Sequence, residues 1–102
     1  MRVRAVWRGT VLADSADTVS ADAVVYFPAK DVAWQYLRPS AKRTMCPWKG
    51  VAAYYTVTVG DVADRDAAWT YHRPWASARR LRGRVAFGGD VTIETTPIRR
   101  DR

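Results

Sequence analysis

The sequence predicts a mainly β fold, a small antiparallel sheet or open barrel with one or two short helices. Hydrophobic residues recur at every second position more often than at the helical spacing of roughly 3.6 residues. Glycine, proline and aspartate interrupt these runs at short intervals, as expected for strands joined by turns. A chain of 102 residues can bury a core without the disulfides that its single cysteine cannot form. We therefore expect residues 1–102 to form a single domain.

Three strands are expected in the first part of the chain. Val3, Ala5 and Trp7 alternate with arginines, which indicates a strand with one buried and one solvated face. Residues 11–13 and residues 23–27 are short apolar runs bounded by turn-forming residues, and they predict two further strands.

A helix, a loop and a long strand are expected next. Residues 31–37 begin with an aspartate and place apolar side chains one helical turn apart, so we expect a helix of two turns. Residues 40–50 are rich in special residues and are interpreted as a loop. Residues 51–59 alternate tyrosine and valine with threonine, and this pattern is the clearest strand signal in the chain.

The last third predicts two more strands, a short helix and a turn. Residues 67–72 alternate as a strand, residues 75–81 are compatible with a short helix, and residues 84–87 form another strand. Gly88 and Gly89 are interpreted as a hairpin-type turn, after which Val91 and Ile93 continue the strand pattern. The tail, residues 99–102, is expected to be frayed.

Positive charge is concentrated toward the end of the chain. Lys and Arg number 17 against 10 Asp and Glu, and residues 65–102 carry nine basic and four acidic side chains. This excess indicates either a solvated face or subunit contact, or a surface for a polyanion or acidic ligand, with nucleic acid the less favoured partner. The steepest run consists of Arg79, Arg80, Arg82 and Arg84.

Several classes of protein are disfavoured. No apolar run reaches the length of a signal peptide or a membrane span, so we expect a cytoplasmic protein without a membrane partner. A structural zinc site needs four ligands, whereas the chain offers only Cys46 and His72 as cysteine or histidine ligands. No Gly-rich phosphate-binding loop of the Walker type occurs, and we expect neither a metal nor a cofactor.

Residues 46–50, Cys-Pro-Trp-Lys-Gly, carry the most distinctive chemistry of the chain. Lys49 lies three positions from Cys46 and could stabilise its thiolate, while Gly50 would allow close approach to the backbone. The alternative interpretation is structural, because a lone cysteine often packs as a small hydrophobic residue and a lysine before glycine often occupies a turn. His72 could act as a base near Cys46, although a position at an exposed strand end is the simpler interpretation.

Aromatic residues suggest a lined pocket. Five tryptophans and five tyrosines are more than a small core needs for filling. Some of these rings could line a site on two neighbouring strands, whereas Tyr55 lies in phase with the expected core. The candidate ligand-binding residues are Trp48, Tyr54, Trp69, Tyr71 and His72.

A set of residues spread over nearly the whole chain resembles the bacterial and fungal family called domain of unknown function 427. Its most specific parts are a Cys-Pro-x-Lys-Gly block leading into Tyr-Tyr, followed by an Ala-Trp-x-Tyr-x-x-Pro block. The residues that carry the resemblance are Tyr26, Phe27, Pro28, Asp31, Val32, Leu37, Ser40, Thr44, Cys46, Pro47, Lys49, Gly50, Ala52, Tyr54, Tyr55, Ala68, Trp69, Tyr71, Pro74, Gly83, Val85, Ala86 and Phe87.

The resemblance implies a compact, mostly β domain of the tent-like sheet type. It also implies that the matching residues Cys46, Lys49, Tyr54, Trp69 and Tyr71 surround a shared site. The family is sometimes labelled nucleotidyltransferase-like, but this chain lacks a Gly-Ser start followed by paired catalytic carboxylates. Two further departures from the family pattern are Gly88-Gly89 in place of an aromatic residue, and Trp48 where tyrosine is more usual.

The leading hypothesis is a small-molecule pocket near Cys46, Lys49 and the segment 69–71, in which Lys49 faces an anionic or carbonyl ligand. A second hypothesis is a small enzyme that uses Cys46 as a nucleophile or Lys49 as a Schiff-base amine. A third is nucleic-acid binding through the arginines of residues 79–84. An exposed sheet edge would also allow a homodimer.

Overall fold

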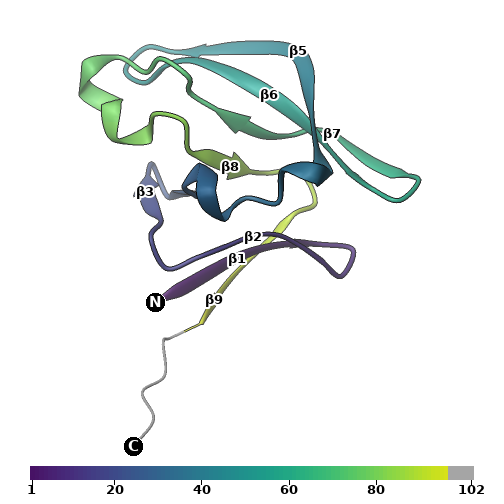
Figure 1. Ribbon diagram of the computed structural model, residues 1–102. Coiled ribbons are helices and arrows are strands. Elements are labelled where there is room, and N and C mark those ends of the chain that lie inside the picture. The colour runs from purple at the N-terminus through teal and green to yellow at the C-terminus, as the bar shows by residue number, and fades with distance from the viewer. Residues whose placement is uncertain (97–102) are drawn as a thin grey trace, which may run out of the picture.

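The computed structural model describes residues 1–96, which form three antiparallel sheets and three short 3-10 helices (Figure 1). A three-stranded sheet has the order β2-β1-β9, a hairpin joins β3 to β4, and a four-stranded sheet has the order β5-β6-β7-β8. The elements are β1 (Arg2–Trp7), β2 (Thr10–Ser15), β3 (Val19–Ala21), β4 (Val24–Tyr26), η1 (Ala29–Asp31), η2 (Trp34–Tyr36), β5 (Leu37–Cys46), β6 (Gly50–Val59), β7 (Val62–Thr70), η3 (Ala76–Leu81), β8 (Val85–Phe87) and β9 (Thr92–Thr96). The mainly β fold class is confirmed.

The alternation along the N-terminal strand is confirmed in β1. Val3, Ala5 and Trp7 are buried, while Arg2 and Arg4 point outward. Both arginines bind Asp14 on the neighbouring strand β2, at 2.8 Å and 3.4 Å. These ion pairs are exposed, so the buried face stabilises the strand more than they do. β1 is the central strand of its sheet, because β9 pairs along its other edge.

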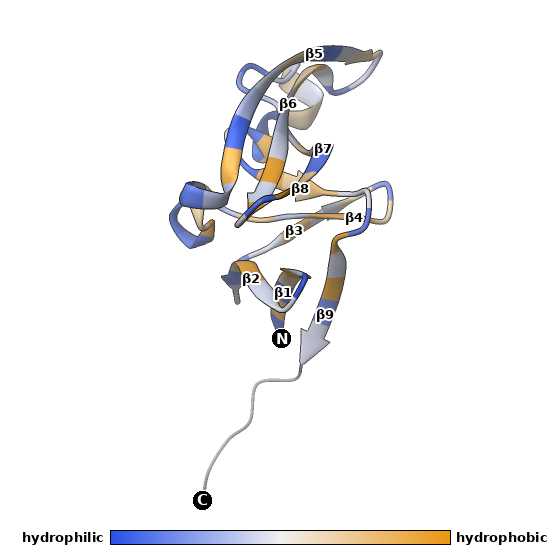
Figure 2. Cartoon of the chain, turned by 90° about the vertical axis from the view of Figure 1, so that its right-hand side faces the viewer, coloured by the Kyte–Doolittle hydropathy of each residue, from blue (hydrophilic) through white to orange (hydrophobic). Residues whose placement is uncertain are grey.

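Two hydrophobic cores occupy the two faces of the four-stranded sheet. The larger core fills the space between this sheet and the three-stranded sheet, and the two fully buried side chains Phe27 and Val57 lie in it. The smaller core lies where β3, β4 and η3 cover the opposite face, around the fully buried Tyr26 and Leu81. Figure 2 shows hydrophobic and hydrophilic bands following one another along β9, and a hydrophobic band on β6.

The two-turn helix expected over residues 31–37 is wrong. The segment forms two separate 3-10 turns, and Leu37 already belongs to β5. Its backbone bonds across to β2 rather than along a helix, because the Ala33 amide donates to the Leu12 carbonyl at 2.7 Å. A pairing between Ala13 and Val32 completes this link. Local helical spacing was therefore outweighed by a tertiary backbone contact.

The loop expected over residues 40–50 is also wrong in most of its length. β5 extends to Cys46 and pairs with β6, so that only a tight turn separates the two strands. β5 is an edge strand whose side chains are exposed on both faces for most of its length, and it therefore shows no hydrophobic alternation. A shift of register between Pro39 and Arg43 further obscures the pattern.

Two other boundaries differ from expectation. β7 runs from Val62 to Thr70, whereas the strand was expected over residues 67–72. The strand has a left-handed backbone at Asp66 (φ 56°) beside a register shift. Gly88-Gly89 does not form a hairpin, because the next strand, β9, pairs with β1 in the other sheet. The predicted frayed tail, residues 99–102, lies outside the described residues.

Candidate functional site

Lys49 is buried at the turn between β5 and β6. Only 7% of its surface is exposed, and its ammonium lies 3.0 Å from a carboxylate oxygen of Asp22 in the β3–β4 turn. The same ammonium lies 5.9 Å from the centre of the Tyr26 ring and 5.2 Å from that of Trp48, within the range of cation–π attraction. Lys49 therefore joins the β5–β6 turn to the β3–β4 hairpin.

Backbone contacts hold this turn against the segment that follows β7. The Trp75 amide donates to the Lys49 carbonyl at 2.9 Å, and the Ser77 hydroxyl donates to the Trp48 carbonyl at 2.8 Å. Gly50 has φ 118°, and a Cβ there would lie 3.3 Å from the Pro74 Cα. The glycine of the Cys-Pro-x-Lys-Gly block is thus explained by packing of backbone on backbone.

The surroundings of Lys49 keep it protonated. Burial of the ammonium lowers the pKa of Lys49, but the hydrogen bond with Asp22 and the nearby Tyr26 hydroxyl outweigh burial and raise this pKa above its usual value. The Tyr26 hydroxyl is itself buried and makes no hydrogen bond of standard geometry within residues 1–96. Burial is also the main reason that the pKa of Tyr71 is raised, although the positive charge of Lys49 opposes it.

The structure places most of the predicted site residues on one face of the four-stranded sheet. Tyr54 and Trp69 pair directly across β6 and β7, and their rings lie 5.9 Å apart. Half-buried Cys46 pairs with Gly50 on the same face, two register positions beyond the pair of Thr44 with Ala52. Lys49 and Tyr71 both lie against Tyr26, since the centre of the Tyr26 ring is 5.9 Å from the Lys49 ammonium and 6.4 Å from the centre of the Tyr71 ring. Cys46 and Lys49 are not among the lining residues of either pocket of residues 1–96 that is described below.

His72 belongs to the opposite face. It follows two residues after Thr70, which pairs with Ala53 and not with the Tyr54 row. The side chain therefore lies away from Cys46 and the aromatic pair, and it lines a different site. The residues that were predicted to form one site therefore lie on two faces of the sheet.

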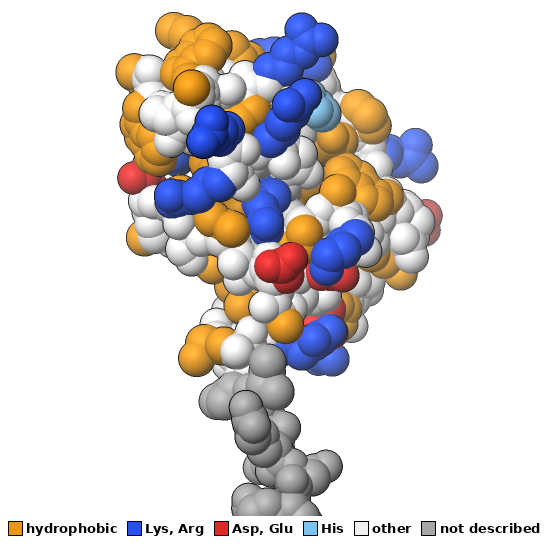
Figure 3. All heavy atoms as spheres, turned by 60° about the vertical axis from the view of Figure 1, so that its left-hand side comes forward, with side chains coloured by type: hydrophobic (Ala, Val, Ile, Leu, Met, Phe, Trp, Pro, Cys, Tyr) orange, Lys and Arg blue, Asp and Glu red, His pale blue; other side chains and the backbone are white. Residues whose placement is uncertain are grey.

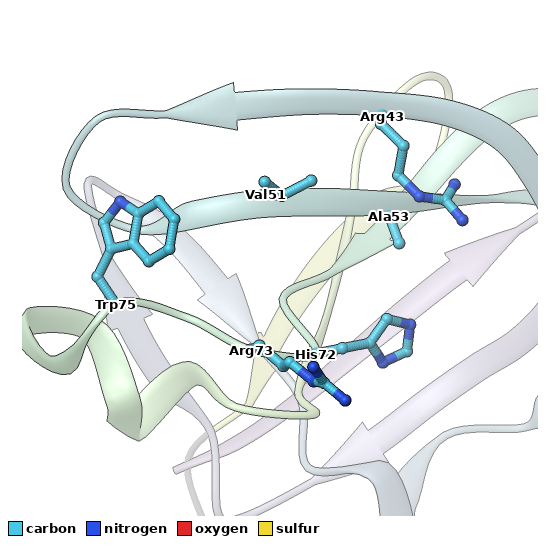
Figure 4. Close-up of a pocket in the computed structure, with 6 residues that line it drawn as sticks. All are labelled: Arg43, Val51, Ala53, His72, Arg73 and Trp75. Atoms are coloured by element: carbon cyan, nitrogen blue, oxygen red, sulfur yellow. The ribbon is translucent and has the colours of Figure 1, made fainter.

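A pocket of about 300 Å³ lies on the face that carries His72 (Figure 4). Its upper wall comes from β5 and β6, and its lower wall from the segment after β7. The lining residues are Arg43, Val51, Ala53, His72, Arg73 and Trp75. Three of them are apolar, and the other three carry or can carry a positive charge; no acidic side chain is among them.

The pocket residues come together through strand register. Arg43 on β5 pairs with Ala53 on β6, and Val51 lies two positions away on the same face. One terminal nitrogen of Arg43 donates to the carbonyls of Ser40 and Lys42 at 2.9 Å and 2.8 Å, which leaves its other donors for a ligand. Sequence reasoning missed Arg43 because residues 40–50 were interpreted as a loop, which has no face.

Residues 1–96 contain neither a cluster of metal ligands nor a helix that could span a membrane. No three side chains of His, Cys, Asp or Glu within residues 1–96 converge to hold a metal ion. The carboxylates of Asp64 and Asp66 serve separate contacts, with the Asp90 amide and the Ser40 hydroxyl respectively. None of the helices in residues 1–96 has the length and apolar character needed to cross a membrane.

Comparison with known proteins gives a family. No curated protein matches the chain. The sequence profile of a family described as a domain of unknown function, DUF427, matches residues 1–96, nearly the whole chain. The chain therefore belongs to the DUF427 family.

Proposed function

We propose that this protein binds a small organic anion in the pocket lined by Arg43, His72, Arg73 and Trp75. The observation that carries the proposal is that two arginines and one histidine line the same pocket as three apolar residues, and that no acidic side chain of residues 1–96 is among the lining residues. Such a combination suits a ligand with a flat apolar part and a negative group.

The size and position of the pocket support this function. A volume of about 300 Å³ lies at the lower end of the range for small-molecule sites. Trp75 is 45% exposed, and its indole can cover one side of a planar ligand while Val51 and Ala53 contact an edge. Neither Arg43 nor Arg73 makes an ion pair with the acidic residues of the described chain, so their charges remain available.

We propose that Arg43 and Arg73, rather than Lys49, supply the positive charge that binds the anionic ligand. The charge of Lys49 is compensated by Asp22, and its surface is nearly closed to a ligand. The raised pKa of Lys49 also opposes its use as a Schiff-base amine, since the nucleophile must be the neutral amine. We propose that Lys49 fixes the turn that leads into β6, and that the anion binds on the other face of the sheet.

Benzoate is a suitable probe, because it combines a flat ring with one carboxylate. We expect its titration, followed by amide chemical shifts, to perturb Val51, Ala53 and His72. Arg43→Gln should weaken binding about tenfold, because one charge-assisted hydrogen bond is worth about 1.5–3 kcal/mol. Arg38→Gln is the matched control, since it removes the same charge from an exposed position of β5 outside this lining.

The control decides the interpretation. Equal weakening by Arg38→Gln and Arg43→Gln would mean that benzoate responds only to net charge, and the proposed pocket would be rejected. If benzoate changed only the amide chemical shifts of Lys49, Tyr54 and Trp69, the ligand would bind on the opposite face of the sheet, and the proposed pocket would also be rejected.

A further inference from the structure

The four arginines of residues 79–84 form two pairs, one bound to backbone carbonyls and one without such contacts in the described part of the chain. Arg80 donates to the Ser20 carbonyl at 3.2 Å, and Arg84 donates to the carbonyls of Asp17 and Arg80 at 2.8 Å and 3.1 Å. This pair fastens η3 and the start of β8 to the segment around β3. The side chains of Arg79 and Arg82 make neither hydrogen bonds nor ion pairs with any other described residue.

Arg79 and Arg82 share a second pocket with Arg73. This pocket has a volume of about 180 Å³, and Pro74 completes its lining. Figure 3 shows Lys and Arg side chains gathered on the half of the molecule that carries His72, with acidic side chains at the margin and below. Three arginines line this one small space, so their like charges repel each other, and within residues 1–96 no acidic side chain lines the space to offset this repulsion.

Arg73 lines both pockets, so the two pockets lie next to each other at this residue. We propose that the second pocket is a phosphate subsite, and that the ligand of the first pocket is a phosphomonoester of a small flat organic compound. The phosphate would bind Arg73, Arg79 and Arg82, and the organic part would lie over Val51 against Trp75. This inference rests on the proposed function, whose ligand class it narrows.

A phosphate fits the second pocket better than a carboxylate. A phosphomonoester near neutral pH carries up to two negative charges on three oxygens, which can accept hydrogen bonds from several planar guanidinium groups at once. A carboxylate has one charge and two oxygens, and a single arginine can saturate it. Three arginines without an acidic partner in the lining therefore match the phosphate in both charge and number of acceptors.

Phenyl phosphate tests the proposal directly, with benzoate as the ligand that lacks the phosphate. In low salt, we expect Arg79→Gln and Arg82→Gln each to lower the affinity for phenyl phosphate at least about tenfold, and to leave the affinity for benzoate within about twofold. Arg80→Gln and Arg65→Gln are charge-matched controls. Arg80 is engaged with a carbonyl and Arg65 is exposed on β7, so each should lower the affinity less than about threefold.

Each result decides one of the two proposals. Equal losses in all four variants would show attraction to net charge alone and would overturn the phosphate subsite. Benzoate binding that depends on Arg43, with phenyl phosphate no tighter than benzoate, would keep the proposed function and reject the subsite. Phosphate binding that depends on Arg79 and Arg82, without benzoate binding, would keep the subsite and reject the first pocket.

A nucleic-acid ligand is distinguished by a third titration. Oligomers of thymidine place phosphodiesters along a strand, so their affinity rises with length and falls steeply with salt when several phosphates are bound. We expect short oligomers to bind more weakly than phenyl phosphate. Tighter binding that grows with oligomer length would overturn the phosphomonoester as the ligand.

Discussion

Replacing Lys49 with methionine removes the charge of a buried side chain and keeps most of its length. The variant loses the contact with Asp22 at 3.0 Å and the attraction to the Tyr26 and Trp48 rings. A hydrogen bond between charged groups contributes about 1.5–3 kcal/mol, and the 54% exposure of the Asp22 side chain places it at the lower end of this range. Each cation–π contact adds about 0.5 kcal/mol or more.

The expected loss in free energy of unfolding is therefore about 2.5 kcal/mol, and no cavity increases it, because the methionine side chain still fills the space of the lysine stem. For a domain of this size, such a loss lowers the Tm by roughly 10 °C. Urea denaturation followed by tryptophan fluorescence at neutral pH measures it. Lys42→Met is the control, since the Lys42 side chain is exposed and its ammonium lies 4.7 Å from the centre of the Tyr54 ring; it should cost less than about 1 kcal/mol.

The difference between the native protein and Lys49→Met should depend on pH in one direction. Because the pKa of Lys49 is higher in the folded chain than in the unfolded chain, its stabilising effect is complete below about pH 10.5. The effect is lost as the pH rises through the folded pKa. A Lys49→Met variant as stable as the native protein at neutral pH, but unable to bind benzoate, would refute the structural role and make Lys49 a ligand-binding residue.

Three further predictions concern the backbone and one carboxylate. Ala23→Gly should stabilise the protein by about 0.5–1 kcal/mol in urea denaturation, because Ala23 has φ 64° in the β3–β4 turn; lower stability would contradict this. Gly50→Ala should lower the Tm more than Gly83→Ala, because a Cβ at Gly50 meets the backbone of Pro74 whereas one at Gly83 meets open space. The hydrogen bond from the Ser15 hydroxyl, followed by that from Lys30, lowers the pKa of Asp31 in the folded chain. Asp31→Asn should therefore be less stable than the native protein near neutral pH, and this difference in stability should disappear as the pH falls below about 4. Thermal melts from about pH 3 to pH 7 would show a constant difference if this were incorrect.

The sequence predicted those strands best whose buried side chains recur at every second position. β1 alternates because only one of its faces enters a core, and β6 is recognisable because Tyr55, Val57 and Val59 pack in or against the larger core. β5 could not be recognised in the same way, since an edge strand exposed on both faces has no period to read. The segment 31–37 was misassigned because its backbone partners lie on β2, which is distant in sequence.

The candidate site shows the same limit. The Cys-Pro-x-Lys-Gly block identified Lys49 as an unusual lysine, and the structure buries it. Local sequence patterns could not predict that Arg43 and Arg73 line one pocket, because their proximity depends on the pairing of β5 with β6 and on the path of the chain after β7. Likewise, the division of the arginine run depends on carbonyls of a distant segment.

The central position of β1 has a consequence for how the protein folds during synthesis. β1 and β2 form a local hairpin that can close within microseconds of leaving the ribosome. The other edge of β1 pairs with β9, matching Arg2 with Thr96, so this ladder must wait until residues 92–96 have emerged. Until then the free edge of β1 exposes a row of unpaired amides and carbonyls to other nascent chains. This exposure is prolonged because bringing β9 back to β1 closes a long loop, which is slow. Truncation before Thr92 would make that vulnerable state permanent.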